Sequence, residues 1–99
     1  MKKKVLFVDD EKSVLSALER TFKTTDFQCY FTESVQGAFN LLKENTFGVI
    51  VSDMRMAEMD GIAFIIEAKA VQPEAVTMIL SGYSDAETVM KAVNEGHIS

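Results

Sequence analysis

Carboxylates that follow short apolar runs are the residues of this 99-residue chain best suited to chemistry. Asp9 and Asp10 come directly after the first apolar run, Asp53 closes the third, and Ser81 follows the fourth. Carboxylates held close together repel one another, so one takes up a proton or the group binds a cation. Oxygen ligands without histidine or cysteine favour Mg²⁺ or Mn²⁺.

Such a cluster also suits phosphoryl chemistry. An aspartate beside a divalent cation can act as a nucleophile and form an aspartyl phosphate. A hydroxyl such as that of Ser81 could then bond a phosphoryl oxygen. Each piece alone has a structural alternative, because Asp9 and Asp10 also suit the N-terminus of a helix and Asp53 also suits a turn. The combination is much less expected by chance if the fold brings these residues together.

The elements that must position these residues are short strands alternating with helices. Continuous runs of β-branched and aromatic residues are typical of strands buried on both faces of a parallel sheet. The sequence contains four such runs: Val5–Val8, Cys29–Phe31, Val49–Val51 and Val76–Leu80. In an open parallel sheet, ligands bind at the carboxyl ends of the strands. If the first and third strands are neighbours, Asp9, Asp10 and Asp53 meet at one edge of the sheet.

Apolar stripes at helical spacing separate and follow the predicted strands. Ser34 and Asp60 are placed to cap the second and third helices. Strand–helix alternation with right-handed crossovers predicts an open, mostly parallel α/β sheet with helices on both faces. The stripes comprise Val14, Leu15, Leu18 and Phe22; Val35, Ala38, Phe39 and Leu42; Ile62, Ile65 and Ile66; and Ala86, Val89, Met90 and Val93.

Composition excludes several classes of protein. Ten Lys and Arg against fifteen Asp and Glu give a net charge of −5, which argues against direct binding of nucleic acid. Cys29 and His97 are the single residues of their types, so an intrachain disulfide and a Cys/His zinc site are excluded. No apolar stretch approaches the roughly 18 residues of a membrane span, and the N-terminus does not match a signal peptide. We therefore expect a cytoplasmic protein with no membrane partner.

Taken together, the motifs resemble the receiver domain of bacterial two-component response regulators. The resemblance rests on Val5–Glu11, Val49–Met56, Met59-Asp60-Gly61 and Ile79–Tyr83, and it extends over residues 1–99. It implies a flavodoxin-like, doubly wound fold with four of the usual five βα units. It also implies a signalling domain that accepts a phosphoryl group and is not itself an enzyme.

The resemblance assigns roles around the acidic cluster. Asp53 matches the phospho-acceptor. Asp10 matches the acidic Mg²⁺ ligand, and Asp9 matches the carboxylate that holds a second metal-bound water. Arg55 matches the position whose backbone carbonyl binds the metal.

Further roles concern the phosphoryl group after transfer and its donor. Ser81 and Tyr83 match positions that sense the phosphoryl group and tune its lifetime. The donor is a histidine kinase or a phosphotransfer protein, which usually docks around the first helix. Ser13, Val14 and Ala17 are candidates for that contact.

Two departures from the family pattern stand out. Ala57 occupies a position where the family usually has proline. No fifth strand, no lysine after it and no fifth helix follow the fourth helical stripe, and Lys91 lies within that stripe. We therefore expect residues 1–99 to be a C-terminally incomplete receiver domain, either truncated or part of a longer protein.

Two expectations follow for association and output. Without a fifth strand, the apolar run Val76–Leu80 becomes an edge of the sheet, so we expect a dimer or larger assembly paired through this strand or swapped. The output domain lies outside this chain. The residues around Asn94-Glu95-Gly96, with those following Asp53 and Ser81, are similar to receivers fused to HD-type cyclic-dinucleotide phosphodiesterase domains.

Three other functions were weighed. A phosphatase of the haloacid dehalogenase type needs a second aspartate two residues after the nucleophile, where this chain has Arg55. A nucleotide-binding domain needs a glycine-rich turn after the first strand, where this chain has Asp9-Asp10-Glu11. A receiver-like dimerisation module that is never phosphorylated remains the alternative to the phospho-accepting receiver.

Overall fold

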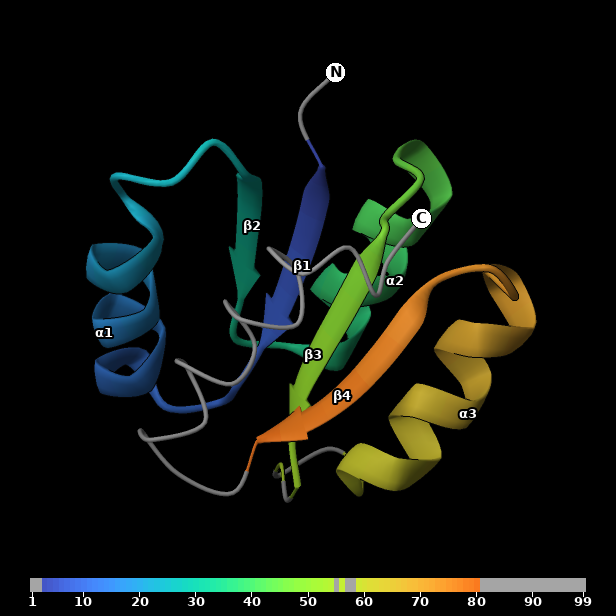
Figure 1. Ribbon diagram of the computed structural model, residues 1–99. Coiled ribbons are helices and arrows are strands. Elements are labelled where there is room, and N and C mark those ends of the chain that lie inside the picture. The colour runs from blue at the N-terminus through green and yellow to red at the C-terminus, as the bar shows by residue number, and fades with distance from the viewer. Residues whose placement is uncertain (1–2, 55, 57–58, 81–99) are drawn as a thin grey trace.

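The computed structural model describes residues 3–54, 56 and 59–80. In this part of the chain four parallel strands form one sheet in the order β2-β1-β3-β4 (Figure 1). The strands are β1 (Lys4–Val8), β2 (Gln28–Thr32), β3 (Val49–Asp53) and β4 (Val76–Leu80). This confirms the open parallel sheet and makes β1 and β3 neighbours.

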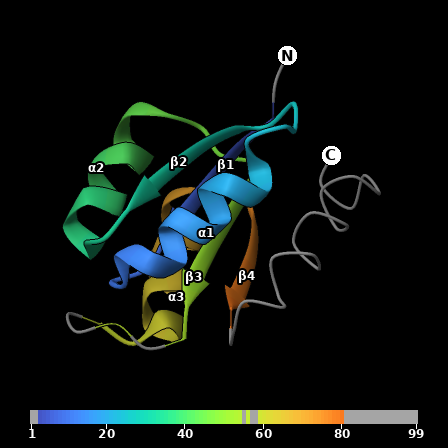
Figure 2. The ribbon, with the colours of Figure 1, turned by 90° about the vertical axis from the view of Figure 1, so that its left-hand side faces the viewer.

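Helices cover both faces of the sheet. Helix α1 (Lys12–Phe22) packs on one face, while α2 (Val35–Glu44) and α3 (Gly61–Val71) pack on the other (Figures 1 and 2). Because successive strand residues point to opposite faces, Val5 and Phe7 join the core under α1, and Leu6 and Val8 join the core under α2 and α3. The two cores explain why the central strands lack alternating polar residues.

Local signals fix where two helices begin. The Ser34 side chain accepts a hydrogen bond of 2.9 Å from the Gly37 N–H at the start of α2. The Asp60 carboxylate accepts one of 2.9 Å from the Ile62 N–H at the start of α3. Both predicted caps are confirmed. The predicted fourth helix, over Ala86 to Val93, lies outside the described residues.

The apolar stripe predicted for the third helix is correct for Ile65, which is half-buried and packs against the core, and wrong for Ile62 and Ile66. Ile62 and Ile66 are 54% and 64% exposed, whereas Phe64 and Ala68 are fully buried. Helix α3 is apolar on nearly every side, so the spacing of its isoleucines did not reveal which side faces the sheet. Packing against β3 and β4 selects the face with Gly61, Phe64 and Ala68 instead.

Burial differs between central and edge strands. Strands β1 and β3 are almost entirely buried, whereas most residues of β2 and β4 are half-buried. The run Cys29–Phe31 is expected from the sequence to be buried on both faces, but Cys29 on β2 is only half-buried. This partial burial raises the pKa of its thiol to about 11. Among the described helices, none has the length and apolarity needed to cross a membrane.

One side chain ties the loop before β3 to the end of α3. The Gln72 amide donates to the backbone carbonyls of Leu42 (3.0 Å) and Asn45 (2.6 Å). Its Oε1 accepts from the Phe47 N–H at 2.8 Å. Gln72 thereby satisfies three backbone groups of the α2–β3 connection, and it holds this connection against the connection between α3 and β4.

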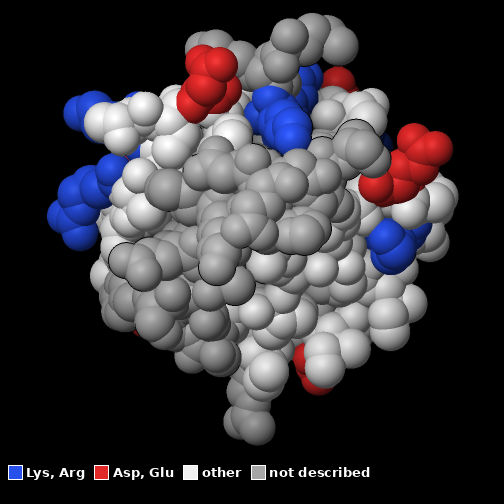
Figure 3. Space-filling model, viewed as in Figure 1, with Lys and Arg blue, Asp and Glu red and all other residues white. Residues whose placement is uncertain are grey.

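On the face shown in Figure 3, blue and red side chains both lie around the rim, with two blue groups next to each other at the upper left. The chain as a whole has more acidic than basic residues, unlike the basic domains that bind nucleic acid.

Candidate functional site

Three carboxylates converge at the carboxyl edge of the sheet. Strands β1 and β3 pair in parallel with Val8 opposite Ser52, so the residues that follow, Asp9 and Asp53, leave the sheet side by side. One carboxylate oxygen from each of Asp9, Asp10 and Asp53 lies within 4.8 Å of the others. The convergence expected from the sequence is therefore present, and strand order is its cause.

Asp9 is the most buried of the three, with 2% of its surface exposed. Burial raises the pKa of the Asp9 carboxyl from its ordinary value of 3.8 to about 6, and the negative charges of Asp53, Asp10 and Glu11 add to the increase. A hydrogen bond of 2.9 Å from the Glu11 N–H opposes it. The charged form of Asp9 is therefore destabilised by burial and by its carboxylate neighbours, and a bound cation would offset this destabilisation.

The arrangement fits a hard divalent cation. Asp10 is exposed, Asp53 is half-buried and Asp9 closes the floor of the site. The cluster offers only oxygen ligands, which suit Mg²⁺ or Mn²⁺. The Asp53 side chain is partly accessible, so a phosphoryl group could reach it, and it lies beside two further carboxylates that could hold a cation. Both properties are needed by an aspartate that attacks a cation-bound phosphoryl group.

Glycine at position 61 allows α3 to lie directly on the backbone of Asp53. The Gly61 N–H donates a 2.8 Å hydrogen bond to the Met54 carbonyl. A Cβ at Gly61 would overlap the Asp53 carbonyl oxygen and lie 2.9 Å from the Met54 carbonyl oxygen. The sequence offered Met59-Asp60-Gly61 only as part of a motif, and the close approach shows what Gly61 does: it positions the end of β3.

Backbone contacts hold the two strand ends in place. The Asp9 N–H donates to the Thr32 carbonyl at 3.2 Å, which ties the loop after β1 to β2. The buried Ser52 hydroxyl donates to the Asp53 carbonyl at 2.9 Å. Sequence reasoning assigned no role to Thr32, whose contact depends on strand pairing, or to Ser52, whose hydroxyl bonds the carbonyl of the next residue.

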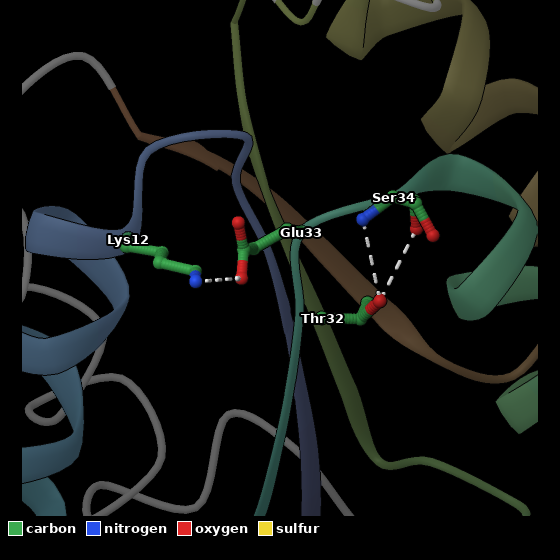
Figure 4. Close-up of polar contacts among 4 residues, drawn as sticks. All are labelled: Lys12, Thr32, Glu33 and Ser34. Carbon is green, nitrogen blue, oxygen red and sulfur yellow. Dashed lines mark hydrogen bonds and ion pairs between the residues drawn. The ribbon is translucent and has the colours of Figure 1, made fainter.

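An exposed ion pair lies near this edge of the sheet. Lys12 Nζ is 3.9 Å from Glu33 Oε2, between the start of α1 and the loop after β2 (Figure 4). In the same loop the Ser34 N–H donates to the Thr32 hydroxyl, which donates to the Ser34 carbonyl, each at 3.3 Å. Lys12 and Glu33 are 82% and 47% exposed, so their pairing contributes little to stability.

The remaining predicted site residues have different outcomes. On α1, Ser13 is exposed and Val14 and Ala17 are half-buried, with Val14 packed against the core beneath the helix. Arg55, Ser81 and Tyr83 lie outside the described residues.

Comparison with known proteins identifies the family. Residues 5–98 match the response regulator receiver domain, and the chain belongs to that family. Its fold is the flavodoxin-like α/β fold of receivers, and the family is a signalling module.

Named relatives support this assignment. The chain is 34% identical over 92 residues to the transcriptional regulatory protein ZraR of Escherichia coli K12, covering 93% of this chain and 21% of the relative. It is 37% identical over 94 residues to the hydrogenase transcriptional regulatory protein HoxA of Cupriavidus necator, covering 95% of this chain and 19% of the relative. The chain therefore spans about a fifth of the length of these relatives.

A solved structure shows the same likeness. The crystal structure of adenylate cyclase from Rhodopirellula baltica superposes with a TM-score of 0.76 at 36% identity, covering 99% of this chain and 73% of that one.

Proposed function

We propose that this receiver accepts a phosphoryl group on Asp53 in the presence of Mg²⁺. The observation that carries the proposal is the convergence of Asp9, Asp10 and Asp53 within 4.8 Å. Asp9 is held there although burial and the neighbouring carboxylates disfavour its charged form. A structural turn or helix cap explains one aspartate at a time. It does not explain three carboxylates held together at the ligand-binding edge of a parallel sheet.

In the proposed reaction an Asp53 carboxylate oxygen attacks the phosphorus of a phosphohistidine. The P–N bond breaks as the new P–O bond forms, and the histidine nitrogen leaves with the bonding electrons. A divalent cation, when bound, neutralises charge on the transferring group. Asp10, Asp53 and the Arg55 carbonyl would hold the cation directly, and Asp9 would hold it through water.

The proposal extends to residues around the acceptor. Gly61 and the Ser52 hydroxyl position the Asp53 backbone, so the nucleophile is held on the rigid end of β3. Ser81 would bond a phosphoryl oxygen, and Tyr83 would tune the lifetime of the phosphoryl group.

Partners follow from the same reading. A histidine kinase or phosphotransfer protein in the cytoplasm would supply the phosphoryl group by docking on α1 around Ser13, Val14 and Ala17. The exposure of Ser13 and the partial exposure of Val14 and Ala17 are compatible with such a contact. For the output, an HD-type phosphodiesterase is one candidate. A transcription-regulating output is the other, favoured by the names of ZraR and HoxA.

Acyl-phosphate labelling tests the proposal. The chain is incubated with Mg²⁺ and acetyl phosphate, and its intact mass is measured. We expect a gain of one phosphoryl group that Asp53→Asn abolishes. Asp26→Asn, the same change at an exposed loop position, is the matched control and should label normally.

A failure to label is informative when Mg²⁺ binding is measured in parallel. If neither this chain nor one extended through a fifth strand with its lysine gains a phosphoryl group while both bind Mg²⁺, the dimerisation module without phosphorylation replaces the proposal. Labelling that persists in Asp53→Asn would also overturn it.

A further inference from the structure

The outer edge of strand β2 has no partner strand among the described residues. Parallel strands bond through every second residue, and the Gln28 N–H and the Thr32 carbonyl both bond on the β1 side. Cys29 and Phe31 therefore direct their backbone N–H and C=O groups away from β1. No other described residue bonds these four groups, so the edge is a template for a further strand.

A groove runs between this edge and helix α1, which lies beside β2 at the end of the sheet opposite β4 (Figures 1 and 2). The larger part of the groove has a volume of about 450 Å³, and its lining includes Phe22, Phe27 and Phe31. The smaller part has a volume of about 220 Å³. Glu19 and Phe31 line both parts, so the two parts adjoin. The groove therefore has room for a large side chain and, next to it, a smaller one.

The groove and the free backbone groups belong to the same residues of β2. The Cys29 and Phe31 side chains pack on the α1 face of the sheet, where they line the groove. Successive side chains of a strand point to opposite faces, so every second side chain of an added strand would point into the groove. Backbone bonding along an edge, with pockets for alternate side chains, is how proteins bind extended peptides by strand addition.

Charge at the groove favours a ligand that carries a carboxylate. Arg20 and Lys23 are exposed beside the larger part, and neither forms an ion pair with another described residue. At the smaller part, Lys12 is already paired with Glu33 (Figure 4). The two cations at the larger part outnumber the single acid there, Glu19, in a chain whose net charge is −5. A carboxylate is therefore attracted to the larger part of the groove.

A second copy of the chain does not meet these requirements. Its own β2 has the Cys29 and Phe31 side chains packed in its core, so they are not available to enter the groove. Two copies, each with a net charge of −5, also repel. We propose that the outer edge of β2 binds an extended segment of a partner protein. This segment adds a strand to the sheet, places an aromatic side chain in the larger part of the groove and brings a carboxylate to Arg20 and Lys23.

This surface is separate from the other surfaces with expected partners. Ser13, Val14 and Ala17, the candidates for kinase docking, line neither part of the groove. Residues 81–99 continue from β4, which is at the opposite end of the strand order and is the strand expected to self-associate. Binding at β2 does not depend on phosphorylation of Asp53.

Selection from a library of random peptides displayed on phage tests this surface. We expect the selected peptides to share an aromatic residue with a carboxylate next to it or two positions away. Synthetic copies of these peptides should bind roughly tenfold more weakly to Lys23→Glu, because a cation beside the groove is replaced by an anion. Lys43→Glu, the same change at an exposed position in the last turn of α2, is the matched control and should bind like the wild type. Circular dichroism confirms folding of each variant.

Hydrogen exchange and N-methylation test whether the peptide adds a strand. In the free chain the Cys29 and Phe31 amides should exchange fast, and a bound peptide should slow them. The Tyr30 amide, which faces β1, should exchange slowly throughout. Single N-methyl groups placed along the peptide should weaken binding at every second position only, because alternate N–H groups of an added strand face β2.

The proposal is overturned if no peptide of this pattern is selected, if Lys23→Glu binds like the wild type, or if N-methylation acts equally at all positions. Slow exchange of the Cys29 and Phe31 amides in the free chain also overturns it. Slow exchange at every concentration would assign the edge to residues 81–99, and slow exchange only at high concentration would assign it to a second copy.

Discussion

The acidic site should make the metal-free protein less stable as the pH rises. Asp9 has a pKa raised from 3.8 to about 6 because the charged form is buried among other carboxylates. A group whose pKa is higher in the folded state favours folding below its unfolded pKa and loses that contribution as the pH rises through its folded pKa. The free energy of unfolding should therefore fall between pH 4 and pH 7.

The size of the effect follows from the two pKa values. A change from 3.8 to about 6 corresponds to about 3 kcal/mol, at about 1.4 kcal/mol for each tenfold change in the acid equilibrium. Asp9→Asn removes the charge and keeps an oxygen that can accept from the Glu11 N–H. At pH 7 in EDTA we expect this variant to be more stable than the wild type by up to about 3 kcal/mol, with a melting temperature higher by up to roughly 12–24 °C.

Urea unfolding of both proteins from pH 4 to pH 7 in EDTA measures this difference. The stabilisation by Asp9→Asn should be large at pH 7 and should shrink toward zero near pH 4, where Asp9 is protonated in the folded protein. Glu44→Gln removes one negative charge at an exposed position and should give little change. Equal stability of Asp9→Asn and the wild type at pH 7 would refute the account of Asp9 as a buried, repelled carboxylate.

Two further substitutions test the positioning of the site and the fold around it. Gly61→Ala places a methyl group against the Asp53 backbone and should destabilise the protein by about 1–3 kcal/mol and slow acetyl-phosphate labelling. Gly37→Ala would displace the Thr32 and Ser34 hydroxyls, including the Ser34 cap of α2, so thermal melts should also show a loss of stability, but it leaves the Asp53 backbone untouched and labelling should be unchanged. Gln72→Leu leaves three backbone groups without their partner and should cost about 2 kcal/mol or more in urea unfolding. Gln36→Leu, at an exposed position on α2, is its control and should cost little.

Local patterns in the sequence determined most of the fold. Continuous apolar runs marked all four described strands, because strands of a parallel sheet are covered on both faces. Ser34 and Asp60 marked helix starts, because a side-chain oxygen there satisfies a free backbone N–H. The strand-end positions of Asp9, Asp10 and Asp53 also predicted the acidic site, since parallel strands end at one edge.

Tertiary structure decided what depends on residues far apart in the chain. The pairing of β1 with β3 brings the three carboxylates together, and the burial that follows sets the pKa of Asp9. The outward face of α3 could not be predicted, because a helix apolar on nearly every side has no periodicity that distinguishes its faces. The role of Gly61 depends on contact with the Asp53 backbone. Sequence patterns report local preference and burial, whereas strand order and packing fix which groups touch.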